Sequence, residues 1–163
     1  MWLRCGQLGG ILPSNMINSF APDFTQHPPR SPRVRLGGYV HLPRLLDKAR
    51  AELVGKNAEY HYNCPLDRHF FDFTGITHAA LLAEAKAGKS DTEMLVWVNA
   101  HAKRGPSEIA AWSAWMCNHA PGGHEGHAWF AEVLAKVAPE RRDTVTFFDL
   151  LDLDDYASYG GKA

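Results

Sequence analysis

The stretch from Tyr60 to Gly75 constrains the fold of this chain more than any other part of the sequence. Pro65 suits the first position of a helix, because its ring holds φ at a helical value and the amide hydrogen that it lacks is not needed there. Gly75 suits the residue just past a helix end, where the backbone often turns left-handed. The two residues predict a short helix over 65–74, with Cys64 at its N-cap.

One side of this predicted helix is aromatic. Leu66, Phe70 and Phe73 recur at helical spacing and share a face with His69, so this face is expected to be buried. The polar residues of the same stretch are dense, yet they match no catalytic signature.

Cys64 is the best candidate for a nucleophile. At a helix N-cap, free amide hydrogens and the positive end of the helix dipole favour a thiolate. His61 or His69 would accept the proton, and Asn63 or Asp67 would orient the base. The alternative is a buried structural cysteine, which is the commoner fate of a free cysteine.

Helical periodicity, capping residues and glycine or proline stops recur along the rest of the chain. They predict an all-α fold, a compact orthogonal array of about seven short helices behind an extended N-terminal strap. The expected helices cover about 43–54, 65–74, 78–87, 91–103, 106–119 and 125–138, followed by a last helix that Asp143 caps and that ends near Leu151. Thr144 to Phe148 is the one candidate strand, and nothing in the sequence offers it a partner.

A chain of 163 residues has the length of one ordinary domain. We expect an upstream extension or a disordered terminus over 1–15, because Met16 could itself start translation. An extended basic strap over 16–41, a single helical domain over 42–155 and a flexible tail over 156–163 would follow.

The charge balance and the cysteines limit the class of protein. There are 17 basic and 18 acidic side chains, so no electrostatic footprint for nucleic acid or an anionic membrane is present. No apolar run is long enough to predict a membrane span. The three cysteines are widely spaced and form no Cys-x-x-Cys pair, which favours a reducing cytoplasm over a disulfide framework.

The strap carries three arginines, Arg30, Arg33 and Arg35, before a Leu-Gly-Gly loop. They could bind a phosphate or carboxylate, or they could pin the strap to acidic residues of the helices. A bidentate pair between Arg33 and Asp67 would be one such lock. The predicted site for a small anionic ligand comprises Arg33, Tyr60, His61, Tyr62, Cys64 and Asp67.

A metal site is a separate hypothesis. Cysteine and histidine are the ligands that zinc prefers, and His124 and His127 could meet one ion from one face of a helix. The candidate ligands for zinc or iron are Cys117, His119, His124 and His127. Their spacing matches no finger or metalloprotease signature, so a glycine-rich loop with surface histidines is the alternative.

Three sequence blocks carry a resemblance to a known family: Arg30-Ser-Pro-Arg33 with Leu36-Gly-Gly, the run from His41 to Arg50, and Tyr60 to Asp67. They resemble an uncharacterised bacterial family defined only as a domain of unknown function, over about residues 30–155. The resemblance implies a small, mostly helical, cytoplasmic protein, and it implies no catalytic residues.

These observations favour non-catalytic binding of a small anionic ligand or a protein partner, with no cofactor. The alternative is a metal- or thiol-dependent enzyme that uses Cys117, His119, His124 and His127, or Cys64, His61 and His69.

Overall fold

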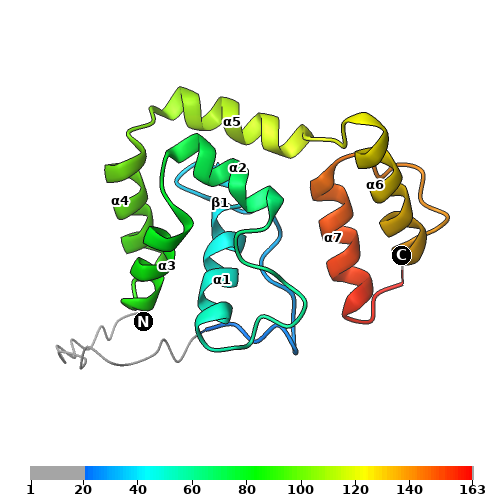
Figure 1. Ribbon diagram of the computed structural model, residues 1–163, viewed down its shortest axis with the longest axis horizontal. Helices are drawn as coiled ribbons and strands as arrows, with labels where there is room; N and C mark the ends of the chain where they lie inside the picture. Colours follow the sequence, from blue (N-terminus) through cyan, green and yellow to red (C-terminus); the bar gives the residue numbers. More distant parts are fainter. Residues whose placement is uncertain (1–20, 163) are drawn as a thin grey trace, which may run out of the picture.

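In the computed structural model, which describes residues 21–162, helix α1 (Leu42–Leu53) lies at the centre of the fold (Figure 1). Every residue from Leu42 to Ala51 is buried. The charged residues of α1 up to Arg50 are thus buried together with its leucines, because neighbouring elements cover all sides of this part of the helix. The extension predicted over 1–15 lies outside the described residues.

Six further helices complete the described part of the fold. They are α2 (Pro65–Thr74), α3 (His78–Lys86), α4 (Asp91–Ala102), α5 (Pro106–Asn118), α6 (Gly123–Val137) and α7 (Phe147–Ser158). Helix α3 packs against α1, α2 packs against α4, and α5 runs across the top of the view in Figure 1 to contact α7. The predicted array of about seven helices is confirmed.

The strap ends in a small antiparallel hairpin that the sequence did not predict. Strands β1 (Arg35–Leu36) and β2 (Tyr39–Val40) pair through Arg35 with Val40 and Leu36 with Tyr39. Gly37 makes the turn at φ 59°, and a Cβ at this position would lie 2.3 Å from Leu95 Cδ1. The conformation therefore favours glycine here, and a larger residue would also have to displace the end of the Leu95 side chain.

Ser113 ties this hairpin to α5. Its hydroxyl donates to the Gly38 carbonyl at 2.8 Å and accepts from the Val40 amide at 3.2 Å. Ser113 is fully buried, so these two bonds satisfy polar groups that have no access to solvent. The end of the strap is thereby fixed against the helical core.

Local helix signals in the sequence are confirmed. Helix α2 begins at Pro65 behind the N-cap Cys64 and ends at Gly75, whose φ is 71°. The Ser90 hydroxyl accepts from the Glu93 amide, while the Glu93 carboxylate accepts from the Ser90 amide at 2.8 Å. This is the reciprocal pattern of a capping box.

The last helix differs from its prediction at both ends. Its N-cap is Thr146, whose hydroxyl accepts from the Asp149 amide at 3.1 Å, whereas Asp143 pairs with Arg141. The helix does not stop near Leu151 but continues to Ser158. Thr144 to Phe148, the candidate strand, instead leads into and begins this helix.

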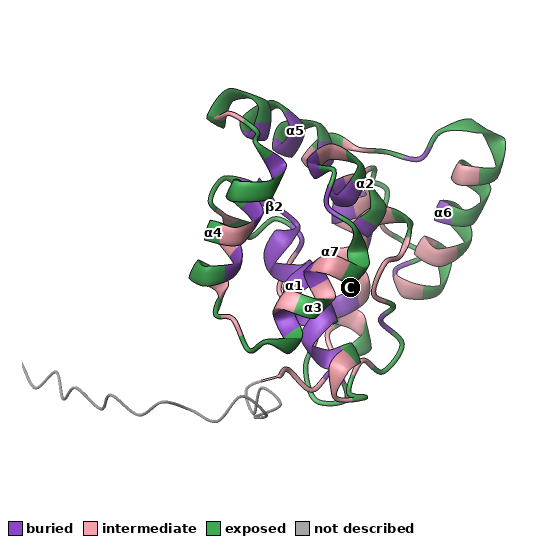
Figure 2. Ribbon diagram, turned by 60° about the vertical axis from the view of Figure 1, so that its left-hand side comes forward, coloured by how far each residue is buried: buried purple, intermediate pink, exposed green. Residues whose placement is uncertain are grey.

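The main core joins the hairpin to helices α1 to α5 and to Phe148 of α7. Helix α6 contributes little to it, because most of this helix is exposed or half-buried (Figure 2). Phe130 is its buried residue, and the helix packs mainly on α7. Within residues 21–162, no helix is both long and apolar enough to cross a membrane.

Candidate functional site

The buried charges of α1 organise the polar interior of the protein. Each pairs with an opposite charge from a different element, and the pairs are Arg44 with Asp155, Asp47 with Arg30, Lys48 with Asp67, and Arg50 with Asp91. A buried charge is costly unless it is paired and hydrogen-bonded. Helix α1 therefore requires the strap, α2, α4 and α7 all to be in place around it.

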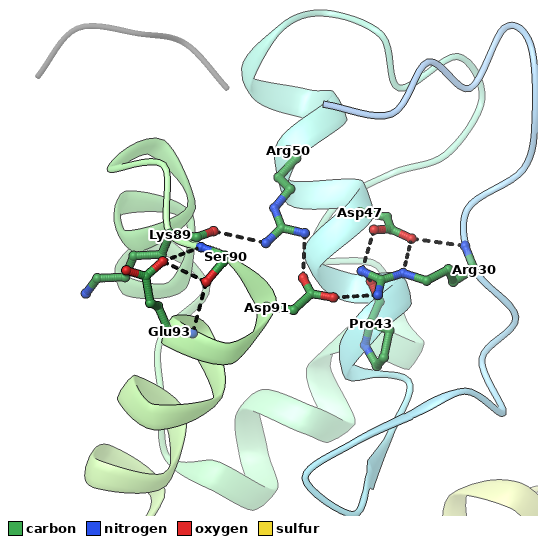
Figure 3. Close-up of polar contacts among 8 residues, drawn as sticks. All are labelled: Arg30, Pro43, Asp47, Arg50, Lys89, Ser90, Asp91 and Glu93. Atoms are coloured by element: carbon green, nitrogen blue, oxygen red, sulfur yellow. Dashed lines mark hydrogen bonds and ion pairs between the residues drawn. The ribbon is translucent and has the colours of Figure 1, made fainter. Parts of the chain in front are cut away.

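Arg30 connects the strap to two helices (Figure 3). Its Nη2 donates to Asp47 Oδ1 at 2.7 Å, and its Nη1 donates to Asp91 Oδ2 at 2.5 Å. Arg50 Nη1 donates to the other oxygen of Asp91 at 2.7 Å. The prediction that the strap arginines pin it to acidic helix residues is confirmed here.

Arg33 holds the strap to α7. Its Nη2 donates to Asp149, its Nε lies 3.3 Å from an Asp152 oxygen, and its guanidinium lies over the ring of Phe148. The predicted pair between Arg33 and Asp67 is therefore wrong. Arg33 reaches α7, while the carboxylate of Asp67 faces α1.

Asp67 is the centre of a cluster that we call the polar junction: His41, Lys48, Cys64 and Asp67. Asp67 is fully buried; its Oδ1 lies 2.8 Å from His41 Nε2 and accepts from Lys48 Nζ at 2.7 Å. Its Oδ2 accepts from the Cys64 amide at 3.3 Å. Burial opposes ionisation, but these hydrogen bonds and the charge of Lys48 outweigh it and lower the pKa of Asp67 to about 2.

Lys48 uses all three of its N–H donors inside the protein. Besides Asp67, its Nζ donates to the His61 carbonyl at 3.1 Å and to Cys64 Sγ at 3.3 Å. The polar neighbour of the thiol is thus Lys48, and neither His61 nor His69 supplies a ring nitrogen to it. His61 contributes its backbone oxygen, and its side chain is exposed.

His41 occupies an unusual place in the polar junction. It is the N-cap of α1, and its backbone φ of 65° is a left-handed conformation that residues other than glycine adopt rarely. Its ring stacks on Phe148 with a centroid distance of 5.7 Å, and its buried Nδ1 has no partner within the described residues. Burial lowers the pKa of His41, so the ring is neutral and its Nε2–H donates to Asp67.

The hydroxyls of both tyrosines of the predicted ligand site are hydrogen-bonded within the protein. The Tyr60 hydroxyl donates to Asp155 at 2.8 Å, and the Tyr62 hydroxyl donates to the His78 carbonyl at 2.7 Å. Burial raises the pKa of both phenols. The structure thus joins Cys64 and Asp67 in one cluster, whereas Arg33 and Tyr60 lie with α7.

A cleft of about 350 Å³ lies between the strap and α7. Pro28 lines one side, and Asp152, Asp155, Tyr156 and Tyr159 line the α7 side. The two carboxylates are those held by the Arg33 and Arg44 side chains. The arginines contact the cleft's acidic groups without forming its lining.

A second cluster lies on the surface, and we call it the aromatic surface: His69, Trp115, His119, Trp129 and Phe147. The His119 ring lies 4.9 Å from His69, 4.5 Å from Trp115 and 5.1 Å from Phe147, centroid to centroid. Trp129 of α6 extends the series, 6.2 Å from Phe147. Trp115 is 46% exposed and Trp129 52% exposed, so aromatic rings from α2, α5, α6 and α7, two of them imidazoles, meet at one surface.

The four candidate metal ligands are distributed over two helices. Cys117 lies on α5, His119 is its C-cap, and His124 and His127 are exposed on α6. Within residues 21–162, no three His, Cys, Asp or Glu side chains gather closely enough to hold a metal ion. The structure instead brings His119 beside His69, a residue of the thiol hypothesis.

Sequence reasoning missed His41 and Lys48, which complete the polar junction. The available signal was the density of charges of both signs on the predicted 43–54 helix, in a segment that was also rich in leucine. It also missed the aromatic surface, because Trp115 and Trp129 come from helices whose packing partners the sequence does not identify.

The fold and its clusters define a small, mostly helical protein whose strap is locked to the core by ion pairs. The chain belongs to the family described as Domain of unknown function (DUF5069), whose model matches residues 26–157. The comparison with curated proteins finds no match.

Proposed function

We propose that this protein is a non-catalytic binding module that recognises a protein partner through the aromatic surface. The observation that carries the proposal is the exposure of Trp115 and Trp129 beside three further rings. Exposed apolar residues are common singly, but contiguous apolar patches mark interaction sites. Tryptophan is also the residue type most enriched among those that dominate binding energy.

Helix α6 adds support, because it packs mainly on α7 and buries Phe130 alone. Trp129 projects from the same helix, which makes it available to a second protein. A partner seated here would cover the free side of α6 and the C-terminal end of α5. It would thus bury apolar area that the fold leaves in water.

Photo-crosslinking tests this proposal. A photoreactive phenylalanine analogue at position 129, in the organism that encodes the protein, should capture a protein, which mass spectrometry then identifies. The same analogue at Val96, which is 66% exposed on α4, is the matched control. Equal capture at both positions would contradict the proposal.

The captured protein then allows a quantitative test. Truncating a central tryptophan costs about 2 kcal/mol, or roughly thirtyfold in Kd. Trp129→Ala should weaken binding by this amount, and Val96→Ala should leave it unchanged. Unchanged affinity of Trp129→Ala would refute the role of the surface.

A small-molecule ligand is the second candidate, and the cleft between the strap and α7 favours it. Asp152 and Asp155, although paired with Arg33 and Arg44, contribute carboxylate oxygens that accept hydrogen bonds, and Tyr156 and Tyr159 add hydroxyl and ring contacts. This lining suits a cationic or hydrogen-bond-donating molecule better than the anion that the strap arginines indicated. Calorimetric titration of spermidine into the wild type and into Asp152→Asn tests whether the cleft binds such a ligand. A Kd that is the same for both proteins would argue against binding in the cleft.

We further propose a cytoplasmic location in a bacterium. The described cysteines, Cys64 and Cys117, are free thiols, as in proteins of reducing compartments. A thiol- or metal-dependent enzyme remains the alternative prediction, and the contact of Cys64 with Lys48 is the feature that bears on its thiol branch.

A further inference from the structure

Cys64 and Lys48 meet at an unusual contact within the polar junction. The Lys48 nitrogen lies 3.3 Å from the Cys64 sulfur, and the lysine side chain is 5% exposed. Two further acceptors, the Asp67 carboxylate at 2.7 Å and the His61 carbonyl at 3.1 Å, fix the position of this nitrogen. A nitrogen and a sulfur are therefore held together by the fold.

Cys64 combines a fixed backbone with partial exposure to solvent. Cys64 is the N-cap of α2, and its amide is bonded to Asp67, so its backbone is fixed at the helix start. Its side chain is partly exposed, while Lys48 beside it is buried. An oxidant thus arrives at sulfur first, with the amine already in reach.

We propose that hydrogen peroxide converts this pair into a reversible covalent crosslink in which one oxygen joins the Lys48 nitrogen to the Cys64 sulfur. Partly exposed thiols are the sites at which peroxide acts, and the first product is a sulfenic acid. A group held against a reactive centre reacts with it far faster than the same group in solution. The fixed amine is therefore the partner that captures the oxidised sulfur.

The reaction proceeds in two balanced steps. In the first, the Cys64 sulfur attacks one oxygen of hydrogen peroxide, the O–O bond breaks, an S–O bond forms and one water leaves, so that sulfur loses two electrons. In the second, an N–O bond forms between the Lys48 nitrogen and the sulfenic oxygen. The two electrons that this bond formation releases reduce a second hydrogen peroxide to two waters. The ammonium loses two protons and the sulfenic acid loses one. Two of these three protons enter the waters, and the third passes to solvent.

The crosslink would change the polar junction in a defined way. Lys48 would no longer carry a charge, so the buried Asp67 would lose its ammonium partner and keep the His41 hydrogen bond. Helices α1 and α2 would at the same time be joined covalently. Oxidation would thereby act on the element that four other segments surround.

Mass spectrometry of the purified full chain tests the proposal. After exposure to hydrogen peroxide, removal of peroxide with catalase and digestion without reductant, a linked peptide pair containing Lys48 and Cys64 should appear. Its mass should equal the two peptides plus one oxygen minus two hydrogens, and a thiol reductant should release both peptides. Cys64→Ser should abolish the pair.

Controls separate the crosslink from ordinary thiol oxidation. Cys117 is also partly exposed, and within residues 21–162 no lysine nitrogen is hydrogen-bonded to its sulfur, so Cys117→Ser should leave the yield unchanged. Lys48→Arg should remove the pair while Cys64 still oxidises. The wild type unfolded in urea should also give no pair, which tests proximity without any variant.

Four results would overturn the proposal. The first is a folded wild type in which Cys64 is oxidised to sulfenic or sulfinic acid while Lys48 stays unmodified, and the second is a disulfide from Cys64 to another cysteine. The third is a linked peptide pair whose mass lacks the oxygen, and the fourth is a yield of the pair in urea equal to that of the folded protein.

Discussion

The polar junction and the aromatic surface lie on opposite sides of one short helix, and they differ in how far their groups are buried. Asp67 and His69 are two residues apart on α2, so their side chains point to different faces. Asp67 is buried and fully bonded, whereas His69 joins a group of rings that faces water. The first region holds the fold together, and the second is available to another molecule.

This contrast predicts the largest effect for Asp67→Asn. The substitution leaves the Lys48 ammonium buried without a carboxylate, and removing one partner of a buried pair costs about 3–5 kcal/mol. The free energy of unfolding, measured in urea, should fall by this amount. Asp72→Asn, on the exposed side of the same helix, is the control and should change it by less than about 0.5 kcal/mol. Equal effects of the two variants would remove the distinction between the two faces of α2.

The pH dependence of stability probes the same junction. The pKa of Asp67 is about 2 when folded against a usual 3.8, so its contribution is complete above about pH 4 and is lost as the pH falls toward 2. Because a tenfold change in proton affinity corresponds to about 1.4 kcal/mol, the lowered pKa of Asp67 stabilises the fold by about 2 kcal/mol above pH 4.

His41 has a lowered pKa, so the unfolded chain binds its proton first, and stability falls as the pH drops below 6.5. Unfolding free energies of the wild type and His41→Gln, measured between pH 7 and 5, test the contribution of His41 to this pH dependence. Parallel curves would show that His41 does not contribute.

Arg33→Ala should have a smaller effect on stability and a clear effect on the strap. Its side chain is 41% exposed, and ion pairs in water contribute about 1 kcal/mol or less. We expect a protease to cleave the strap of this variant faster than that of the wild type, as measured by gel electrophoresis of the digest. Arg35→Ala is the matched control, because Arg35 donates to the Gly38 carbonyl of its own hairpin. An unchanged digestion pattern in Arg33→Ala would mean that the other contacts of the strap, among them those of Arg30 and Ser113, hold it without Arg33.

Trp129→Ala should change stability least. The ring is 52% exposed, and substitutions at such surfaces are usually within about 0.5 kcal/mol. A measured loss above about 2 kcal/mol in urea unfolding would show that Trp129 serves the fold. The aromatic surface would then resemble the polar junction.

The helix positions could be predicted where the signal was local. Pro65 and Gly75 act within their own turns, and both were assigned correctly from the sequence; the capping box of Ser90 and Glu93 is an equally local feature. The hairpin at Gly37 was missed because its two-residue strands are too short to show a pattern of alternation.

The end of α7 could not be predicted, because its stability depends on distant residues. Acidic residues near a helix C-terminus are unfavourable alone. Asp152 and Asp155 are instead neutralised by Arg33 of the strap and Arg44 of α1, which are far away in sequence. The polar junction could not be predicted for the same reason, because the partner of Cys64 is Lys48, which lies on an earlier helix.

The pairing of the α1 charges has a consequence for how the protein can be cut. A fragment that stops before Phe147 would strand Arg44, which is 2% exposed, without Asp155. A fragment that starts after Arg30 would similarly leave Asp47 without its guanidinium. Each of these two cuts strands an ion inside the remainder, so the smallest autonomous unit must include both Arg30 and Asp155.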